Sequence, residues 1–161
     1  MKTDLPMLEQ RRIEAAIVKP IYEELAAELG EAKAQELIGR AIINNARAQG
    51  RAYAEAEGRD TSLATFAETL PQWTAGGALE LEVQEQNEER FVFNVTRCRY
   101  SEMYREMGLG ELGHLLSCNR DGTFCDGYDP RIRLERSQTI MGGAGHCDFR
   151  FHYDGQAEDA E

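Results

Sequence analysis

The chain has 161 residues, of which 42% are hydrophobic and 29% charged, and its formal net charge is −11 at pH 7. This length suits one domain, which buries enough surface for a stable core without disulfides. The negative charge argues against nucleic acid and anionic membranes as partners, because both require a basic surface. An anionic small molecule stays open as a partner, since its site needs only one or two local cations.

The first 30 residues predict a long helix. Residues 13, 17, 21, 25 and 29 are Ile or Leu, so they recur every fourth residue and share one apolar face. Pro20 lies within this run and predicts a kink or a break. Gly30 predicts the end of the helix.

Two further helices are expected before residue 72. An apolar stripe runs from Ala34 toward Tyr53, and Gly58 closes that helix. One of residues 60–62 (Asp, Thr, Ser) caps a short third helix, which Pro71 is expected to stop.

The rest of the chain predicts strands with short helices between them. Residues 79–83 alternate apolar and polar side chains, and after the polar turn 86–89 apolar residues recur at 91, 93 and 95, which is typical of a β-hairpin with one buried face. Residues 98–107 and 111–120 predict short helices. A strand begins at 132–134, and the glycine-rich loop 142–145 interrupts it. In the last strand, residues 147, 149, 151 and 153 face one way.

These elements predict an α+β fold, with an N-terminal helical layer packed on an antiparallel sheet and short helices inserted between the strands. We expect a single domain over 1–161, with a frayed acidic tail at 156–161.

The cysteines indicate chemistry more than disulfides. The N-terminus has no apolar run of 7–15 residues and no stretch approaches 18 apolar residues, so we expect a cytoplasmic protein without a membrane segment. In a reducing compartment, the clustered Cys98, Cys118, Cys125 and Cys147 are more typical of catalysis, metal binding or burial.

His114 and Cys118 are four residues apart in a predicted helix and therefore share a face. Such a pair can hold a transition metal or combine an imidazole with a thiolate, and Asp121 follows one turn later. The alternative is that Cys118 is simply buried and His114 lies on the surface.

The other three cysteines differ in their surroundings. Cys147 shares a strand face with aromatic residues and points inward, either as core or as part of a site beside the loop 142–145, whose N–H groups would suit an oxyanion. The alternative for that loop is a plain turn. Cys98 lies at a predicted helix start, and a helix start lowers a thiol pKa. Cys125 is expected in a loop without a role, so its replacement by Ser should be nearly silent.

No GxSxG, P-loop, GxGxxG or HExxH motif occurs in the sequence, which argues against the common hydrolase, nucleotide-binding and zinc-protease classes. Other segments, however, form an ordered set. They are Val95-Thr96-Arg97-Cys98, then Cys118 to Asp121, then Thr139, and finally Gly143 to Phe149 with its Cys147-Asp148-Phe149.

This set resembles the L-2-amino-thiazoline-4-carboxylic acid hydrolase family over about residues 8–153. The closing glycine and Cys-x-Phe pattern also resembles vinyl-reductase-like domains, which are small-molecule-binding modules. The first resemblance implies hydrolysis of a small cyclic amidine or thiazoline that carries a carboxylate, giving a carbamoyl amino acid. It maps catalytic positions onto Cys98, Cys118, Asp121 and Cys147, and places Thr139, Gly143 and Asp148 around them.

Two mechanisms follow from the resemblance and stay open. A thiolate of Cys118 or Cys147 attacks the ring carbon, or a divalent transition metal (Zn, Mn or Co) held by Cys98, Cys118, Cys147, His114 or His146 activates water. The substrate carboxylate requires a cation, for which Arg97 and Arg120 are the first candidates, with Arg136 and Arg150 also available.

The alternative belongs to a different class of function: a sensor that would bind a ligand at the same site without turning it over. The expected partner is a small molecule, and a homo-oligomer is compatible with the sequence.

Overall fold

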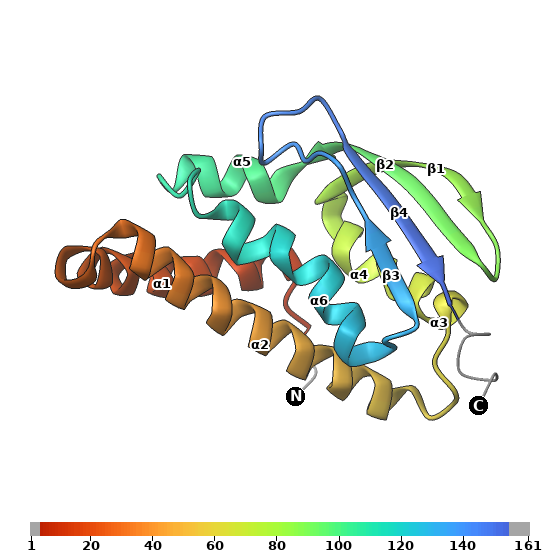
Figure 1. Cartoon of the computed structure of the whole chain (residues 1–161). Coiled ribbons are helices and arrows are strands. Elements are labelled where there is room, and N and C mark those ends of the chain that lie inside the picture. The colour runs from red at the N-terminus through yellow and green to blue at the C-terminus, as the bar shows by residue number, and fades with distance from the viewer. Residues whose placement is uncertain (1–3, 155–161) are drawn as a thin grey trace.

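The computed structural model describes residues 4–154, in which a layer of long helices packs against one face of an antiparallel sheet (Figure 1). Helices α1 (Met7–Leu29) and α2 (Glu31–Glu57) form the outer layer, and α6 (Asn119–Tyr128) lies between α2 and the sheet. The remaining elements are α3 (Leu63–Ala67), α4 (Leu70–Thr74), a 3-10 turn η1 (Ala75–Gly77), β1 (Leu79–Gln86), β2 (Arg90–Cys98), α5 (Arg99–Glu106), a π-helical turn η2 (His114–Cys118), β3 (Ile132–Glu135) and β4 (Cys147–Tyr153). The predicted α+β architecture is confirmed, while the predicted acidic tail 156–161 lies outside the described residues.

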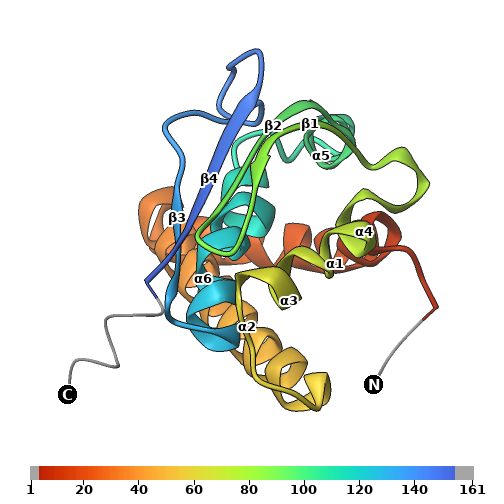
Figure 2. The same cartoon turned by 90° about the vertical axis from the view of Figure 1, so that its right-hand side faces the viewer.

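The sheet has the strand order β1-β2-β4-β3, with every neighbouring pair antiparallel. Phe93 of β2 lies opposite Phe149 of β4, and Val95 lies opposite Cys147. Figure 2 shows the strands arching over α3 and α6, so the aromatic face of the sheet points toward these helices. The predicted hairpin and the predicted last strand are both confirmed.

Helix α1 buries a different face from the one its sequence suggests. Ile13, Ile17 and Ile21 are 56%, 62% and 49% exposed. The face that packs against α2 and α5 follows a second stripe, spaced alternately by three and four residues: Leu8, Arg11, Ala15, Val18, Tyr22 and Leu25. Both stripes have a helical period, and only the position of the neighbouring helices decides which one is buried.

Helix α1 also continues through Pro20 without a break. Pro20 is exposed. The carbonyl group that proline leaves without its helical hydrogen bond can therefore bind water, which reduces the cost of the missing bond.

Helices α2 and α6 approach each other closely at two glycines. A Cβ atom at Gly50 of α2 would lie 2.1 Å from the carbonyl oxygen of Phe124, and one at Gly127 of α6 would lie 2.0 Å from that of Arg47. No real side chain fits at such distances, so both positions require glycine for packing.

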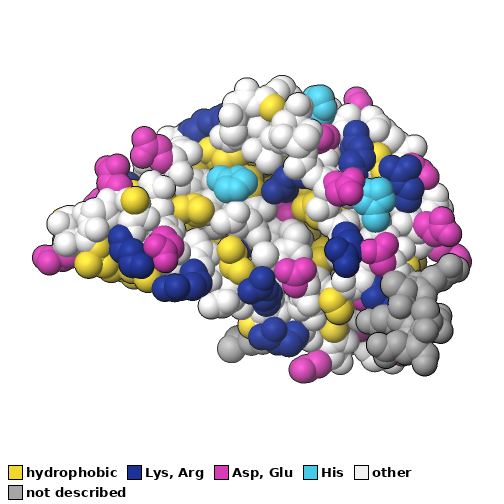
Figure 3. Space-filling model, viewed as in Figure 1, with side chains coloured by type: hydrophobic (Ala, Val, Ile, Leu, Met, Phe, Trp, Pro, Cys, Tyr) yellow, Lys and Arg dark blue, Asp and Glu magenta, His cyan; other side chains and the backbone are white. Residues whose placement is uncertain are grey.

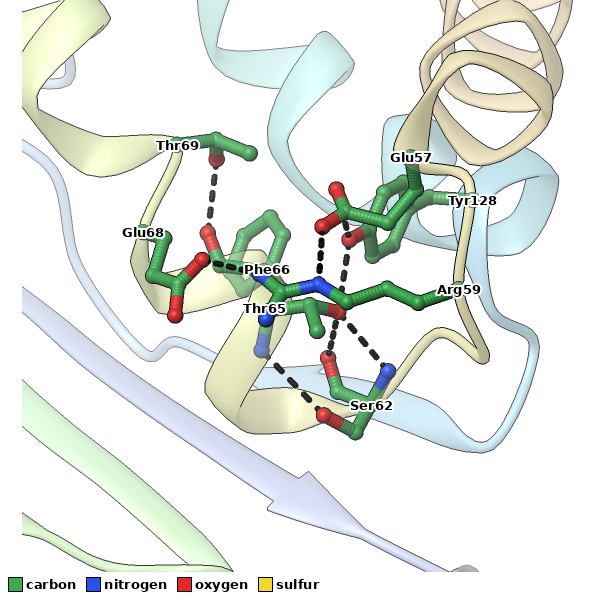
Figure 4. Close-up of polar contacts among 8 residues, drawn as sticks. All are labelled: Glu57, Arg59, Ser62, Thr65, Phe66, Glu68, Thr69 and Tyr128. Carbon is green, nitrogen blue, oxygen red and sulfur yellow. Dashed lines mark hydrogen bonds and ion pairs between the residues drawn. The ribbon is translucent and has the colours of Figure 1, made fainter.

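A polar cluster joins the ends of α2, α3 and α6 (Figure 4). Ser62 and Thr65 form a capping box that starts α3, which confirms the predicted cap. The Tyr128 hydroxyl lies 2.7 Å from Thr65 Oγ1 and 3.3 Å from Glu57 Oε2. Arg59 contacts both Glu57 and Glu68.

Two predicted boundaries are wrong. Pro71 does not stop a helix but lies in the first turn of α4, where its missing N–H costs nothing. The predicted helix 111–120 is instead the π turn η2, which continues into α6 as far as Tyr128. Cys125 therefore lies in a helix and not in a loop.

Charged side chains of both signs are spread over the surface (Figure 3). On the face shown in Figure 3, acidic and basic side chains are interspersed and no large patch of one sign is seen. No helix within residues 4–154 is long and apolar enough to cross a bilayer.

The close contact of α2 and α6 gives a stability prediction. Gly127→Ala should lower the free energy of unfolding by about 1–3 kcal/mol or more, because the new methyl group overlaps the Arg47 carbonyl. Urea denaturation measures the change.

Gly122→Ala in the same helix is the control, since its Cβ would meet Leu134 at 3.9 Å, an ordinary contact. It should leave stability unchanged or raise it by up to about 1 kcal/mol through helix propensity. Equal effects of the two substitutions would contradict the packing argument.

Candidate functional site

A cavity of about 100 Å³ lies under the sheet. Because a single water needs only about 10–15 Å³ of such space, the cavity has room for a small organic molecule. It lies where the two hydrophobic clusters of the protein meet, and Cys98 and Leu79 pack against both clusters. The apolar side chains that line it include Phe66, Leu70, Trp73, Phe93, Phe124, Met141, Phe149 and Phe151.

Three cysteines from three parts of the chain line this cavity: Cys98, Cys118 and Cys147. Cys98 ends β2 and caps α5, and its Sγ accepts from the Ser101 N–H at 3.4 Å. Cys147 begins β4, and its Sγ accepts from the Ile140 N–H at 3.2 Å. Cys118 ends the π turn η2, and π turns are frequent at functional sites. All four cysteines of the chain are free.

The thiols are held in their neutral form. Burial first and the nearby Asp121 carboxylate second raise the pKa of Cys118 to about 12. Burial also raises the pKa of Cys98 and of Cys147, although the N–H groups of Ser101 and Ile140 oppose the shift. The start of α5 therefore does not lower the pKa of Cys98 as expected, because loss of water outweighs it.

Asp121 of α6 faces the same cavity and forms an ion pair with Arg136. Its Oδ2 lies 2.6 Å from Arg136 Nη1, and Arg136 Nη2 donates to the Cys118 carbonyl at 3.1 Å. The Arg136 guanidinium also lies 5.0 Å from the ring centre of Phe149. The Asp121 side chain keeps 37% of its surface accessible.

Asp121 is partly buried in the lining of the cavity. Burial consequently raises the pKa of the Asp121 carboxyl, while the charge and hydrogen bond of Arg136 oppose the shift. An aspartate in this setting is a stronger base than one on the surface.

Two buried arginines meet at the N-terminal end of α6, where Arg120 directly precedes Asp121 in the chain. Arg11 of α1 donates to both carboxylate oxygens of Glu14 at 2.9 and 3.0 Å, and its guanidinium lies 5.9 Å from the ring centre of Trp73. Arg120 donates to the Leu116 carbonyl, Asn45 and Gln49. Arg120 Nη2 also lies 3.6 Å from Glu14. Both arginines line the cavity.

Of the residues expected at the site, Cys98, Cys118, Cys147, Asp121 and Arg120 line the cavity. Six others do not: Thr139, Gly143, Asp148, Arg97, His114 and His146. Of the two further arginine candidates, Arg136 lines the cavity and Arg150 does not.

Most of these six organise the loop between β3 and β4. The Asp148 carboxylate accepts from the backbone N–H groups of Ser137 and Gln138. Thr139 Oγ1 accepts from the Gly142 N–H at 3.0 Å, and Gly143 has a φ of 103°, which favours glycine. Gln138 Nε2 donates to the His146 carbonyl.

The glycine-rich loop forms a turn. The N–H groups of Gly142, Gly143 and Ala144 all donate to carbonyls of residues 139 and 140 within the loop. The loop therefore does not present these N–H groups to the cavity as an oxyanion site, and the alternative interpretation as a turn agrees with the structure.

Arg97 and His114 also lie outside the cavity lining. Arg97 is half exposed and pairs with Glu102 at 3.2 Å and Glu80 at 3.9 Å. His114 begins the π turn that Cys118 ends, so their expected partnership on one α-helical face is replaced by a different geometry.

Cys125 is fully buried in the core beneath the sheet and does not line the cavity. Replacement by Ser would bury a hydroxyl group there, so from this position we predict that the substitution lowers stability and is not silent.

The expected metal ligands do not come together in the part of the chain that the structure describes. Within residues 4–154, no three His, Cys, Asp or Glu side chains are placed so that one ion contacts them all. The donor set expected for Zn, Mn or Co therefore does not fit a metal in this arrangement.

Sequence reasoning missed Arg11, Trp73, Tyr104 and Ser117, which also line the cavity. A signal for Arg11 exists, because it occupies one position of the stripe Leu8, Arg11, Ala15, Val18 that α1 buries. A charged residue in a buried stripe indicates a partner or a site. Tyr104 and Ser117 carry no such signal.

Solved structures share the fold. The phenol-responsive sensory domain of the transcription activator PoxR, determined with phenol, matches with a TM-score of 0.54 and 17% identity, over 91% of this chain and 79% of that one. A trafficking protein particle complex subunit 3 from Naegleria fowleri, covalently bound to palmitic acid, matches with a TM-score of 0.52 and 8% identity, over 89% and 95%. At these identities the likeness concerns the fold alone.

No curated protein is significantly similar to the chain. The profile of one family, however, matches residues 10–151, which include every cavity-lining residue named above. On this match, the chain belongs to the L-2-amino-thiazoline-4-carboxylic acid hydrolase family.

Proposed function

We propose that the protein hydrolyses a C–N bond of a small cyclic amidine that carries a carboxylate, such as L-2-amino-thiazoline-4-carboxylate, and releases a carbamoyl amino acid. The observation that carries the proposal is the Asp121–Arg136 ion pair, which faces the same cavity as three thiols. Family membership supports the reaction type.

The charges of the cavity complement those of such a substrate. A protonated cyclic amidine is positively charged and suits the Asp121 carboxylate. Its carboxylate suits the arginines that line the cavity, Arg11 and Arg120. A bound amidinium would also oppose the effect of Asp121 on Cys118, because a cation favours the thiolate.

The nucleophile follows from the cost of deprotonation. The Cys118 thiol has a pKa of about 12, whereas free water has a pKa of about 15.7. The thiol is therefore easier to ionise than water. We therefore assign the attack to Cys118 and the role of base to Asp121, its neighbour one helical turn later.

In the first half of the reaction, Cys118 Sγ bonds to the amidine carbon and its proton passes through Asp121 to the ring nitrogen. The bond between that carbon and the ring nitrogen then breaks. The nitrogen leaves as an amine after taking a second proton from the exocyclic amino group, which becomes an imine on the carbon still bound to Sγ.

In the second half, water adds to the carbon of this intermediate. One water proton goes to the imine nitrogen and the other returns to Sγ as the C–Sγ bond breaks. The oxygen stays on the carbon as a carbonyl, so that one water is consumed and the thiol is restored.

A ligand-binding module without turnover is the second candidate. The aromatic walls favour it, since Phe93 and Phe149 stack with ring centres 4.8 Å apart beside Phe151. In the resting protein, no hydrogen bond joins a cysteine to a basic side chain among the contacts of the described residues. A module of this kind would bind the ring compound without consuming it.

Asp121→Asn gives the first test. Loss of the base should lower kcat/KM for L-2-amino-thiazoline-4-carboxylate more than ~100-fold. Chromatography of the carbamoyl product measures the activity. Asp126→Asn is the matched control in α6, because Asp126 is half exposed and lies 3.7 Å from Arg47.

Wild-type protein that binds the compound but never releases product would refute the hydrolase and favour the binding module. Equal activity of the two asparagine variants would remove Asp121 from the reaction.

Cys118→Ala tests the nucleophile. It should abolish turnover, and acid-quenched wild-type protein should carry a substrate-derived mass on Cys118 that the variant lacks. Cys125→Ser serves as a contrast, with unfolding free energy lower by about 1–3 kcal/mol and near-normal turnover in the folded protein. Full activity of Cys118→Ala would assign the attack to water instead.

The raised thiol pKa values predict slow alkylation. Since only the thiolate reacts, iodoacetamide should modify the three cavity cysteines of the substrate-free protein slowly at pH 7–8. The rate should rise with pH toward the value of about 12 for Cys118 and not level off near the ordinary value of 9. Peptide mass spectrometry measures each site, and rapid modification at pH 7 would contradict the neutral resting state.

A further inference from the structure

The cavity wall formed by α1 and α6 holds more positive than negative charge. Arg11 and Arg120 are only 2% and 6% exposed, and both contact the single carboxylate of Glu14. On the other side, Arg136 is matched by Asp121. Three guanidinium groups therefore face two carboxylates, which leaves one positive charge without a partner in a chain whose net charge is −11.

An uncompensated buried cation is costly unless a ligand neutralises it. The crowding acts on Arg120, because burial first and the charge of Arg11 second lower its pKa to about 10. The surplus charge calls for an anion in the cavity.

The three arginines differ in the hydrogen bonds they have left to give. Arg120 donates through Nε and Nη1 to Leu116, Asn45 and Gln49, and its Nη2 lies 3.6 Å from Glu14. Arg136 uses both terminal nitrogens, for Asp121 and the Cys118 carbonyl. Arg11 uses Nη1 for Glu14, but its Nη2 is buried and has no hydrogen-bond partner among the described residues.

A buried donor without a partner is rare and needs an explanation. The arginine is also fixed in place, since Glu14 holds one side of the guanidinium and the Trp73 ring lies 5.9 Å from its centre. A donor that is positioned before a ligand arrives binds it with less loss of entropy.

We propose that Arg11 binds the carboxylate of the substrate and selects anionic ring compounds over neutral ones. The inference rests on the proposed function for the identity of the ring, while its test requires no turnover. The fork of a guanidinium can match a carboxylate, and Nη2 is the donor that Arg11 has free.

Two compounds that lack the C=N bond, thiazolidine-4-carboxylate and thiazolidine, differ only in the carboxylate and cannot undergo the reaction. Trp73 is the only tryptophan of the chain and lines the cavity, so its fluorescence reports binding directly. Wild-type protein should bind the carboxylate about 10- to 100-fold more tightly than thiazolidine, the range expected of a charged hydrogen bond.

Arg11→Gln should reduce this ratio to below about 3-fold, while Arg12→Gln should preserve it. Arg12 is the matched control, because it is the next residue of α1, has 43% of its side chain exposed and pairs with Glu9. Arg11→Lys keeps the charge but has a single terminal nitrogen, so it should retain less than a third of the preference. It replaces Arg11→Gln if circular dichroism shows that the latter is unfolded.

A folded Arg11 variant with the full preference, or wild-type protein without a preference, overturns the inference. The two proposals fail separately. Preference for the carboxylate without hydrolysis of the thiazoline would refute the reaction and leave the anion site in place. Hydrolysis that Arg11→Gln does not affect would refute the anion site and leave the reaction in place.

Discussion

The contact between α2 and α6 at Gly50 and Gly127 is the constraint on which the rest of the structure depends. Because backbone touches backbone there, α6 is held at a single height and rotation against α2. That position directs Asp121 toward the sheet and lets Arg120 reach Asn45 and Gln49 of α2. The cavity exists because α6 is held close to α2 and the sheet arches over it (Figure 2). A wider helix pair would move α6 toward the strands and fill the space.

Within this frame, loss of water dominates the chemistry of the site. Cys98 shows the balance, since it caps α5 and accepts an N–H, yet burial still raises its pKa. The same effect moves the Asp121 carboxyl in the direction of a stronger base, against the pull of Arg136. The resting cavity thus keeps its thiols neutral and its carboxylate poised, and the charge of an incoming ligand alters this balance more than any group already present.

The sequence predicts the sheet better than the helices. Apolar side chains recur at every second position in Phe91, Phe93 and Val95 and again from Cys147 to Tyr153, so the two strands and the inward position of Cys147 follow directly. Helix α1 offers two apolar stripes of similar period, and the choice depends on where α2 and α5 lie, which no local pattern records. The π turn η2 likewise adds one residue to a helix without any signature. Three cysteines and Asp121 could be assigned to the site by resemblance, whereas the roles of Thr139, Gly143 and Asp148 in shaping a loop appear only in three dimensions.

The exposed stripe of α1 has a consequence for the behaviour of the protein in solution. This stripe exposes large apolar side chains to water: Ile13, Ile17, Ile21 and Leu29. The net charge of −11 meanwhile keeps copies of the protein apart by repulsion. That repulsion vanishes near the isoelectric point of about 4.8, where nothing opposes contact between these stripes. Charge repulsion therefore keeps the molecules dispersed, and the exposed apolar face of α1 is the place where they associate once that repulsion is lost. Mild acid should bring molecules together along α1 before it unfolds them.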